Sequence, residues 1–372
     1  MIVLNAAWNL VNFRAGLIRA LVARGYEVVA VAPYDDYAPR LAAFGARFVA
    51  LPMQTQGTNP IQDLRLLGRF WRLLRREQPA VYLGYTVKPN VYGSLAAHTL
   101  GIPVINNIAG LGAVFINDSW LTRLVRQLYR LALARSARVF FQNQDDLQQF
   151  VQSGLVRAAA ADRVPGSGID LDRFQPAPMP ADDGVVRFLL IARMLWDKGV
   201  GEYVEAARRL KPRYPNTEFR LLGFVDAPNP TAITRQQMDA WVAEGGVSYR
   251  GVSDNVASEI AEVDCVVLPS YREGTPRTLL EAAAMARPLI TTDTVGCRDV
   301  VDDGVNGLLC QPRDAADLAE KMERLLVLPA AERARLGQAG RAKMAREYDE
   351  RLVIDKYLEA IQAVLNRKQG HT

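Results

Sequence analysis

Two glutamates, Glu273 and Glu281, are the residues whose types and spacing point most directly to chemistry. Their segment predicts a buried strand, a loop and then a helix that begins near Pro276. The first backbone N–H groups of such a helix have no partner within it, and together with the helix dipole they favour a diphosphate. At ~1.5 Å per residue, the helix advances about 7.5 Å from Pro276 to Glu281, which matches a diphosphate plus part of a ribose.

Each residue between the glutamates has a place in this hypothesis. We expect Thr275 to cap the helix and Pro276 to take its first position. The predicted donor-binding segment is Gly274, Thr275, Pro276, Arg277, Thr278 and Leu279, with free backbone N–H groups on the last three. Glu281 would accept from ribose hydroxyls, and Glu273 would face whatever group is bonded to the far phosphate. The alternative is an ordinary surface helix in which Arg277 and Glu281 form an i, i+4 ion pair.

Two cations, Arg193 and Lys198, follow a predicted strand at 187–191. Positive charge at this place could hold a diphosphate and offset the charge of a departing group. The alternative is an exposed loop that carries ordinary charges.

The alternation of strand and helix patterns along the chain predicts the elements that must position these residues. Strands are predicted at 28–32, 81–84, 139–142, 187–191, 219–222, 247–249, 265–268 and 288–291, and helices at 16–24, 63–77, 91–100, 120–134, 279–285 and 350–366. We therefore expect an α/β protein with two Rossmann-like, doubly wound domains that face across a cleft. Ligands of such sheets bind beyond the carboxyl ends of the strands.

A stretch rich in Pro, Asp and Ala at 176–184 is typical of a linker between the two domains. The first domain is predicted to cover residues 1–168, the second residues 169–349, and residues 350–372 are predicted to form a final helix. The family resemblance described below implies that the first domain binds the acceptor, that the second binds the nucleotide-sugar, and that the final helix returns to the first domain.

Four residues of the first domain are candidates for binding an acceptor or a phosphate. The family resemblance described below implies a loop at 8–16, from which Arg14 could meet a phosphate of the acceptor or the donor. Lys88 follows the strand at 81–84 and could point into the cleft. Asn107 and Gly110 follow the next strand, where glycine would let the backbone approach a sugar. The alternatives are a surface arginine and plain connecting loops.

Composition narrows the class of protein. Hydrophobic residues make up 49% and charged residues 23%, which is usual for a globular protein. No apolar run reaches the ~18 residues of a membrane span, and we expect no signal segment. Cys265, Cys297 and Cys310 lack metal-ligand spacing, so we interpret them as packing residues in a reduced, cytoplasmic setting. Only two histidines, His98 and His371, are present, which excludes most histidine-based catalysis.

The pair Asp170 and Asp172 could be mistaken for a metal-binding D-x-D motif. It follows the glycines Gly166 and Gly168 instead of a nucleotide-binding strand, so we interpret Asp170 as structural. We expect no metal and no other cofactor.

Positive charge is concentrated in the first half of the chain. Residues 1–168 contain 18 Lys and Arg against 9 Asp and Glu. The segments 64–76 and 120–138 are basic and amphipathic, and such helices can lie on anionic lipid, each basic residue contributing ~1 kcal/mol. We expect peripheral membrane contact through one of them. The alternative is that both simply cover a sheet.

Four segments together resemble glycosyltransferase family 4, a family of retaining GT-B enzymes. The family's E-x7-E motif is matched at 273–281, and further likeness lies at 193–199, 268–270 and 291–293. The resemblance extends over nearly the whole chain and is strongest to bacterial enzymes that extend lipid-linked saccharides. It implies that Arg193 and Lys198 bind the donor diphosphate, that Glu273 holds the sugar, and that Val252 lies near the nucleobase.

The resemblance implies a retaining transferase that moves an N-acetylhexosamine from a UDP-sugar to a saccharide on undecaprenyl diphosphate, in cell-surface glycan synthesis. It would act at the inner face of the cytoplasmic membrane, without nucleic acid. The chain departs from the family at 8–16, which lacks paired glycines, and at Ala109, near which many relatives have a histidine. A sugar-nucleotide epimerase, a phosphorylase and a non-catalytic nucleotide-sugar binding protein remain alternatives.

Overall fold

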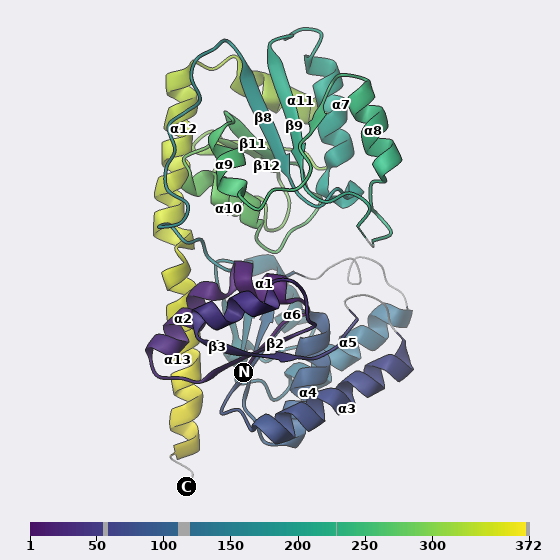
Figure 1. Cartoon of the computed structure of the whole chain (residues 1–372), viewed down its shortest axis with the longest axis vertical. Coiled ribbons are helices and arrows are strands. Elements are labelled where there is room, and N and C mark those ends of the chain that lie inside the picture. Colours follow the sequence, from purple (N-terminus) through teal and green to yellow (C-terminus); the bar gives the residue numbers. More distant parts are fainter. Residues whose placement is uncertain (55–58, 111–119, 228, 370–372) are drawn as a thin grey trace. The chain divides into compact units, whose positions relative to one another are not determined.

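The computed structural model describes residues 1–54, 59–110, 120–227 and 229–369, with only the backbone of 120–122, 368 and 369. The chain divides into two compact units, which Figure 1 colours along the sequence. Unit 1 comprises Met1–Ser167 and Glu350–Thr372, and unit 2 comprises Gly168–Asp349. The sequence placed the boundary one residue later. The last helix thus belongs to unit 1 although it follows unit 2 in the chain.

Unit 1 is built on a parallel seven-stranded sheet in the order β3-β2-β1-β4-β5-β6-β7. Its strands are β1 (Ile2–Val3), β2 (Val28–Ala32), β3 (Ala46–Ala50), β4 (Tyr82–Tyr85), β5 (Val104–Ile108), β6 (Arg138–Phe141) and β7 (Ala161–Arg163). The strand order reverses direction between β1 and β4. This pair therefore marks the topological switch point, where ligands of doubly wound sheets bind.

Helices cover both faces of this sheet because β2 is apolar on both sides. Val28 and Ala30 face one core cluster, and Val29 and Val31 face the other. The first cluster is completed by α1 (Ala7–Phe13), α2 (Ala15–Ala23), the 3-10 helix Ala38–Phe44 and α13 (Glu350–Gln369), and the second by α3 (Pro60–Glu77) and α4 (Ser94–Thr99). Further along the sheet lie α5 (Trp120–Leu133) and α6 (Gln144–Gln152).

Unit 2 repeats the plan with a parallel six-stranded sheet in the order β10-β9-β8-β11-β12-β13. Its strands are β8 (Val186–Ile191), β9 (Thr217–Leu222), β10 (Ser248–Tyr249), β11 (Cys265–Leu268), β12 (Leu289–Thr292) and β13 (Gly307–Cys310). Here the order reverses between β8 and β11. The switch point of unit 2 thus lies between the strands that precede the two predicted donor-binding segments.

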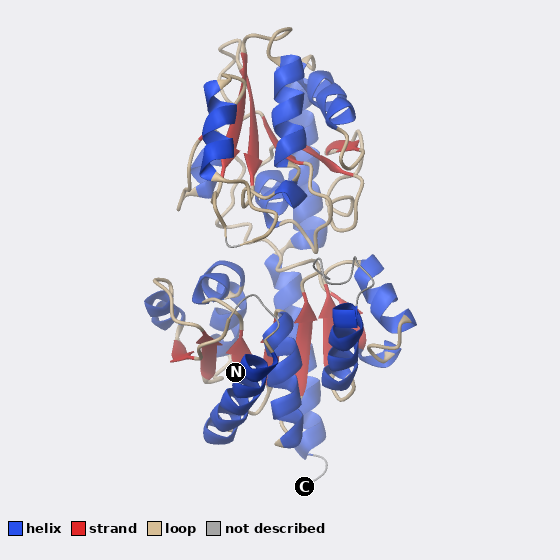
Figure 2. Ribbon diagram, turned by 90° about the vertical axis from the view of Figure 1, so that its right-hand side faces the viewer, coloured by secondary structure: helices blue, strands red, loops and turns tan. Residues whose placement is uncertain are grey.

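The helices of unit 2 also form two layers, which Figure 2 shows on either side of the strands. Phe188 and Leu190 of β8 face one layer, whereas Leu189 and Ile191 face the other. The helices are α7 (Val200–Leu210), α8 (Arg235–Ala243), α9 (Val256–Ala261), α10 (Arg277–Ala284), α11 (Ala315–Leu326) and α12 (Ala330–Lys343). The predicted α/β class with two doubly wound domains is confirmed.

Two local predictions were wrong. Residues 8–16 form no loop: α1 occupies Ala7–Phe13, and α2 begins directly after Arg14. Ala7 and Leu10 are fully buried, so packing on the sheet stabilises this short helix, and Ala6 provides no side-chain cap that the sequence could have revealed. The helix predicted at 91–100 begins earlier, with a π turn at Pro89–Gly93 whose first carbonyl accepts from the Tyr82 hydroxyl.

No helix among the described residues combines the length and the apolar character needed to cross a membrane.

The predicted linker at 176–184 is fastened to unit 2 by one buried arginine. Arg287 is fully buried, and its guanidinium donates to the carbonyls of Ala177 at 2.9 Å and Pro178 at 2.7 Å. It also donates to the carbonyls of Ile260 and Ala261, at the end of α9. Burial lowers the pKa of Arg287, which records the cost of holding a cation there.

Replacing Arg287 by Met should destabilise unit 2 by about 3 kcal/mol or more, since several buried carbonyls lose their donor. Urea unfolding followed by circular dichroism measures the change. Arg335→Met is the matched control, because Arg335 is exposed on α12 and, among the described residues, its ion pair is with the exposed Glu332; its effect should stay within about 0.5 kcal/mol. Equal unfolding midpoints for the two variants would contradict this role of Arg287.

Candidate functional site

The switch point of unit 2 brings together the two predicted donor-binding segments. β8 leads into the 3-10 turn Trp196–Lys198, and β11 leads into the loop that carries Glu273. The Lys198 ammonium and the Glu273 carboxylate form an ion pair, and both side chains are largely buried, at 19% and 14% exposure. Residues 75 positions apart in the sequence therefore meet where the fold favours a ligand.

Backbone contacts hold the loops after β8 and β11 together. The Tyr271 amide donates to the Asp197 carbonyl at 3.0 Å, and the Ser270 hydroxyl donates to the same oxygen at 3.2 Å. Gly199 has a φ of 70°, and a Cβ at this position would lie 2.1 Å from the Pro269 carbonyl oxygen. Only glycine suits both constraints. Lys198 is thus placed by the backbone on either side of it.

The loop after β12 supports the Glu273 segment from the other side. The Glu273 amide donates to the Val295 carbonyl at 3.1 Å. Gly296 has a φ of 81°, and a Cβ here would lie 2.4 Å from the carbonyl oxygens of Glu273 and Gly274. The Thr292 hydroxyl donates to the Ser270 carbonyl. Three loops at the carboxyl edge thus form one connected support.

The start of α10 differs from the prediction. Pro276 occupies the cap position, without a side-chain hydrogen bond, so Thr275 is not the cap. The Leu279 amide donates to the Pro276 carbonyl at 3.1 Å. It is therefore not free, contrary to the prediction. The physical reason is that the helix begins one residue later than predicted, which leaves Thr275 outside it and brings Leu279 within reach of the cap carbonyl.

Glu281 lies one turn into α10, where it pairs with Arg277. The Arg277 Nε donates to Glu281 Oε1 at 2.9 Å, so the alternative i, i+4 pair is formed. This pair is largely buried, at 15% and 13% exposure, and is no ordinary surface pair. Burial raises the pKa of Glu281, while Arg277 opposes the shift. A ribose at Glu281 would have to share this carboxylate with Arg277.

The two remaining candidates of unit 2 are exposed. Arg193 lies two residues after the end of β8. Val252 is 51% exposed and follows β10, two strands away from β8. Its loop is tied to the neighbouring one, because the Gly223 amide donates to the Gly251 carbonyl at 2.7 Å. The structure therefore brings Lys198 and Glu273 together and leaves Val252 at a separate part of the same edge.

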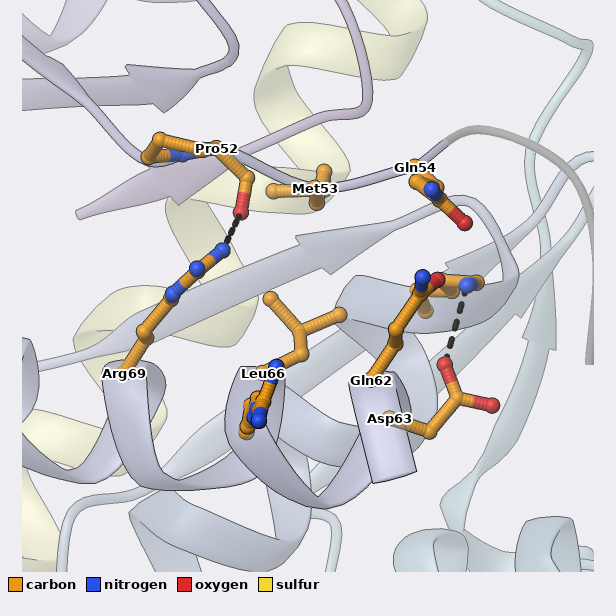
Figure 3. A pocket seen from close by; sticks show the side chains of 9 residues that line it. Pro52, Met53, Gln54, Gln62, Asp63, Leu66 and Arg69 are labelled. Atoms are coloured by element: carbon orange, nitrogen blue, oxygen red, sulfur yellow. Dashed lines mark hydrogen bonds and ion pairs between the residues drawn. The ribbon is translucent and has the colours of Figure 1, made fainter. Parts of the chain in front are cut away.

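Lys88 of unit 1 forms an ion pair within that unit. Its ammonium donates to the Asp63 carboxylate of α3 at 2.9 Å, and both side chains are largely buried. The pair lines a hollow of about 220 Å³ between α3 and the segment after β3 (Figure 3). In that view Arg69 reaches across the hollow to the Pro52 carbonyl, at 2.8 Å. This pocket does not contain the other predicted site residues.

The other candidates of unit 1 lie near the carboxyl ends of β4 and β5. Arg14 is buried, with its guanidinium carbon 4.3 Å from the centre of the Tyr85 ring. Asn107 is fully buried at the end of β5, in register with Tyr85. Gly110 has a φ of 128°, which favours glycine. The prediction that Asn107 follows the strand was wrong, because β5 extends to Ile108. Residues 111 and 112, after Gly110, lie outside the described residues.

Several side chains that the sequence analysis predicted to have no part in catalysis or binding have structural roles. The Asp170 carboxylate accepts the backbone amides of Asp172 at 3.0 Å and Arg173 at 2.9 Å, which makes it a turn residue, as predicted. His98 contacts the Ala132 carbonyl at 2.8 Å through Nε2. The three cysteines are buried and free. His371 lies outside the described residues. Within the described part of the chain, no cluster of His, Cys, Asp or Glu has the grouping of a metal site.

Sequence reasoning missed Tyr85, Tyr357, Gly199 and Gly296. Tyr357 lies on α13, and its ring centre is 5.9 Å from that of Tyr85. No local pattern reveals a contact across 272 positions. The two glycines carried a weak signal, since each follows a predicted strand by a few residues, where tight turns are common.

Two parallel sheets, each with helices on both faces, define the class of protein as GT-B. HepE of Anabaena, solved in complex with UDP and glucose, shares this fold with a TM-score of 0.77 and 17% identity over 97% of this chain and 98% of that one. WaaG, a glycosyltransferase involved in lipopolysaccharide biosynthesis, does so with a TM-score of 0.75 and 15% identity, over 97% of this chain and 98% of that one.

The family follows from the sequence models. Residues 12–166 match the "Glycosyl transferase 4-like domain", and residues 186–327 match "Glycosyl transferases group 1". Together the two matches cover most of the chain, which therefore belongs to the glycosyltransferases built from these two domains.

Two curated relatives extend along both domains. The N,N'-diacetylbacillosaminyl-diphospho-undecaprenol alpha-1,3-N-acetylgalactosaminyltransferase of Campylobacter jejuni is 28% identical, over 97% of this chain and 97% of that protein. The capsular polysaccharide biosynthesis glycosyltransferase CapM of Staphylococcus aureus is 20% identical, over 83% of each. The predicted resemblance to glycosyltransferases of lipid-linked and capsular saccharides is confirmed.

Replacing Gly296 by Ala should displace the Glu273 loop, because the new methyl group would overlap two of its carbonyl oxygens. We expect weaker UDP binding and a loss of stability of about 1–3 kcal/mol. Isothermal titration with UDP and thermal unfolding measure the two effects.

Gly304→Ala is the matched control for this substitution. Gly304 has a similar φ of 73° but no atom within 4 Å of an added Cβ. It therefore carries the same backbone strain without the overlap. If both variants bound UDP with the same affinity, the proposed support of Glu273 by Gly296 would be wrong.

Proposed function

We propose that this glycosyltransferase is a retaining enzyme that moves an N-acetylhexosamine from a UDP-sugar to a saccharide carried on a polyprenyl diphosphate. The meeting of Lys198 and Glu273 at the switch point of unit 2 is the observation that carries the proposal. The Campylobacter relative supports the choice of donor sugar and acceptor, because its name specifies both and its likeness spans the whole chain.

Different residues of unit 2 would bind different parts of the donor. Lys198 and Arg193 would bind the diphosphate and offset the charge that develops on it as it departs. Glu273 orients Lys198 before the donor binds and would hold sugar hydroxyls afterwards. Glu281 would accept from the ribose, and Val252 would lie near the base. The remaining residues of 274–279 would line the diphosphate.

The chemistry requires no protein nucleophile. The acceptor hydroxyl attacks the anomeric carbon from the face that the diphosphate leaves, and the bond from that carbon to the UDP oxygen breaks. The proton of the hydroxyl passes to an oxygen of the departing diphosphate. The products are the extended saccharide and UDP, with the anomeric configuration kept. This route needs no metal, because Lys198 and Arg193 supply the positive charge.

The proposal is tested by incubating the protein with UDP-, GDP- and dTDP-sugars and a polyprenyl diphosphate-linked acceptor, with and without EDTA. We expect transfer from a UDP-N-acetylhexosamine, with retention of configuration by NMR and no loss in EDTA. Inversion would overturn the retaining assignment. Isomerisation of the UDP-sugar without acceptor would indicate an epimerase, and binding without turnover would indicate a binding protein.

Lys198→Ala should lower kcat by about 10²- to 10³-fold, since the departing diphosphate loses a preorganised cation. Steady-state kinetics and thermal unfolding measure the effects on turnover and folding. Lys321→Ala is the control, because Lys321 on α11 also forms a partly buried ion pair, with Asp317, at 23% and 20% exposure. Near-normal turnover of the Lys198 variant would refute its role.

We further propose that unit 1 reaches its lipid-linked acceptor by resting α3 on the membrane. The outward face of α3 carries Ile61, Leu64, Arg65, Trp71, Arg72 and Arg75, all of them exposed. Apolar tips and arginines on one face suit an anionic surface. In α5, by contrast, Arg126 and Arg130 bond to Ser153 within unit 1. This favours α3 over α5 as the contact.

Leu64→Asp should weaken binding to phosphatidylglycerol vesicles by about tenfold or more, because an apolar tip is lost and a negative charge is added. Vesicle sedimentation measures the partitioning. Val242→Asp on α8 of unit 2 is the control, since Val242 is also an exposed apolar residue, at 39%. Equal partitioning of the wild-type chain and the Leu64 variant would rule out docking through α3.

A further inference from the structure

Four buried side chains of unit 1 gather at the carboxyl edge of its sheet without satisfying their polar atoms. They are Arg14, at 5% exposure, Tyr85, at 2%, Asn107, at 0%, and Tyr357, at 1%. The atoms without a hydrogen-bond partner are Arg14 Nε, Tyr85 Oη, Asn107 Nδ2 and Tyr357 Oη. Buried polar atoms are nearly always paired in native proteins, so four orphans in one place require an explanation.

The four residues form one cluster. The Arg14 guanidinium stacks on Tyr85, whose ring is next to that of Tyr357. Tyr85 and Asn107 are register neighbours on β4 and β5. The Tyr357 hydroxyl lies near both of them without reaching hydrogen-bond geometry. Phe140, whose ring centre is 4.8 Å from that of Tyr357, closes the cluster on its inner side.

All four orphan atoms can donate a hydrogen bond. Arginine Nε and the asparagine amide nitrogen only donate, and a neutral tyrosine hydroxyl donates as well. Burial raises the pKa of Tyr85 and of Tyr357, so both hydroxyls keep their protons. The two hydroxyls can also accept, but Arg14 Nε and the Asn107 amide nitrogen cannot, so donors outnumber acceptors and the cluster matches a ligand rich in acceptor oxygens, such as a phosphate.

The charge of the cluster is also unbalanced. Arg14 forms no ion pair with a carboxylate of the described chain. Glu350 is near Gly16 in space, since a Cβ on Gly16 would lie 2.6 Å from its carboxylate. A buried cation without a counter-charge is costly. Arg14 also caps the N-terminus of α2, whose dipole adds positive potential.

We propose that Arg14, supported by Tyr85, Asn107 and Tyr357, is the subsite of unit 1 that binds a phosphate of the acceptor's polyprenyl diphosphate. This inference rests on the proposed transfer to such an acceptor. It places the diphosphate of the acceptor on unit 1, apart from the donor diphosphate that Lys198 holds on unit 2. The donor and the acceptor both carry a diphosphate, so the test must distinguish binding of one from binding of the other.

The test compares Arg14→Gln and Arg14→Lys with the wild-type chain in two assays. One measures the KM values for the lipid-linked acceptor and for the UDP-sugar. The other measures binding of farnesyl diphosphate and of UDP by titration, which needs no turnover. Arg19→Gln is the matched control, because Arg19 lies on α2 and also stacks on an aromatic ring, that of Phe44 at 4.6 Å, but is exposed.

Arg14→Gln should raise the acceptor KM and the Kd of farnesyl diphosphate by about 10- to 100-fold, since a charge-assisted contact is lost. The UDP affinity should stay unchanged, Arg14→Lys should recover part of the loss, and Arg19→Gln should resemble the wild type. The thermal midpoint should be unchanged or higher, because an uncompensated buried charge is removed.

Three results would overturn the inference. If Arg14→Gln changed neither the acceptor KM nor the binding of farnesyl diphosphate, the stacking of Arg14 on Tyr85 would be purely structural. A loss of UDP affinity alone would assign Arg14 to the donor. A lower thermal midpoint in both variants, with normal farnesyl diphosphate affinity, would show that Arg14 only stabilises the fold. If the wild-type chain transferred no sugar, the proposed function would fail, while the titration would still test the subsite.

Discussion

Parallel strands can be joined only by long crossovers, and this constraint decides where every candidate side chain lies. Each crossover returns the chain to the same side, so all carboxyl ends of the strands gather at one edge. Where the strand order reverses, two neighbouring loops lead away in opposite directions and leave room for a ligand. Lys198 and Glu273 meet at that point in unit 2, and Tyr85 lies at the corresponding point of unit 1.

Backbone segments approach one another closely at this edge of unit 2. Gly199 and Gly296 allow carbonyl groups to approach where any side chain would collide. Their effect is to fix Lys198 and Glu273 from both sides before a donor arrives. Preorganised charge of this kind contributes more to transfer than charge that must be gathered during the reaction. The two units differ in this respect, because Lys198 has a carboxylate as its partner, whereas Arg14 has no carboxylate partner among the described residues.

Much of the fold could be predicted because its signals are local. The strands at 28–32 and 265–268 are short apolar runs with the bounds that the structure shows, and the reversal of charge between the two halves is a matter of counting. That the segments carrying Lys198 and Glu273 are neighbours follows once the strand order of a doubly wound sheet is assumed, but the ion pair between the two side chains was not predicted. The helix at Ala7–Phe13 was missed because burial of Leu10 stabilises it, and the exact start of α10 because the cap is a proline.

The sequence by itself determined the α/β class, the glycosyltransferase family and the segments that we propose to hold the donor, because these depend on periodicity and on motifs within short stretches. Only the tertiary structure decided that Lys88 forms an ion pair with Asp63, and that Arg277 forms one with Glu281. It alone placed Tyr357, from the end of the chain, beside Tyr85. The physical reason is that burial and pairing are properties of neighbours in space, which crossovers bring together from distant positions.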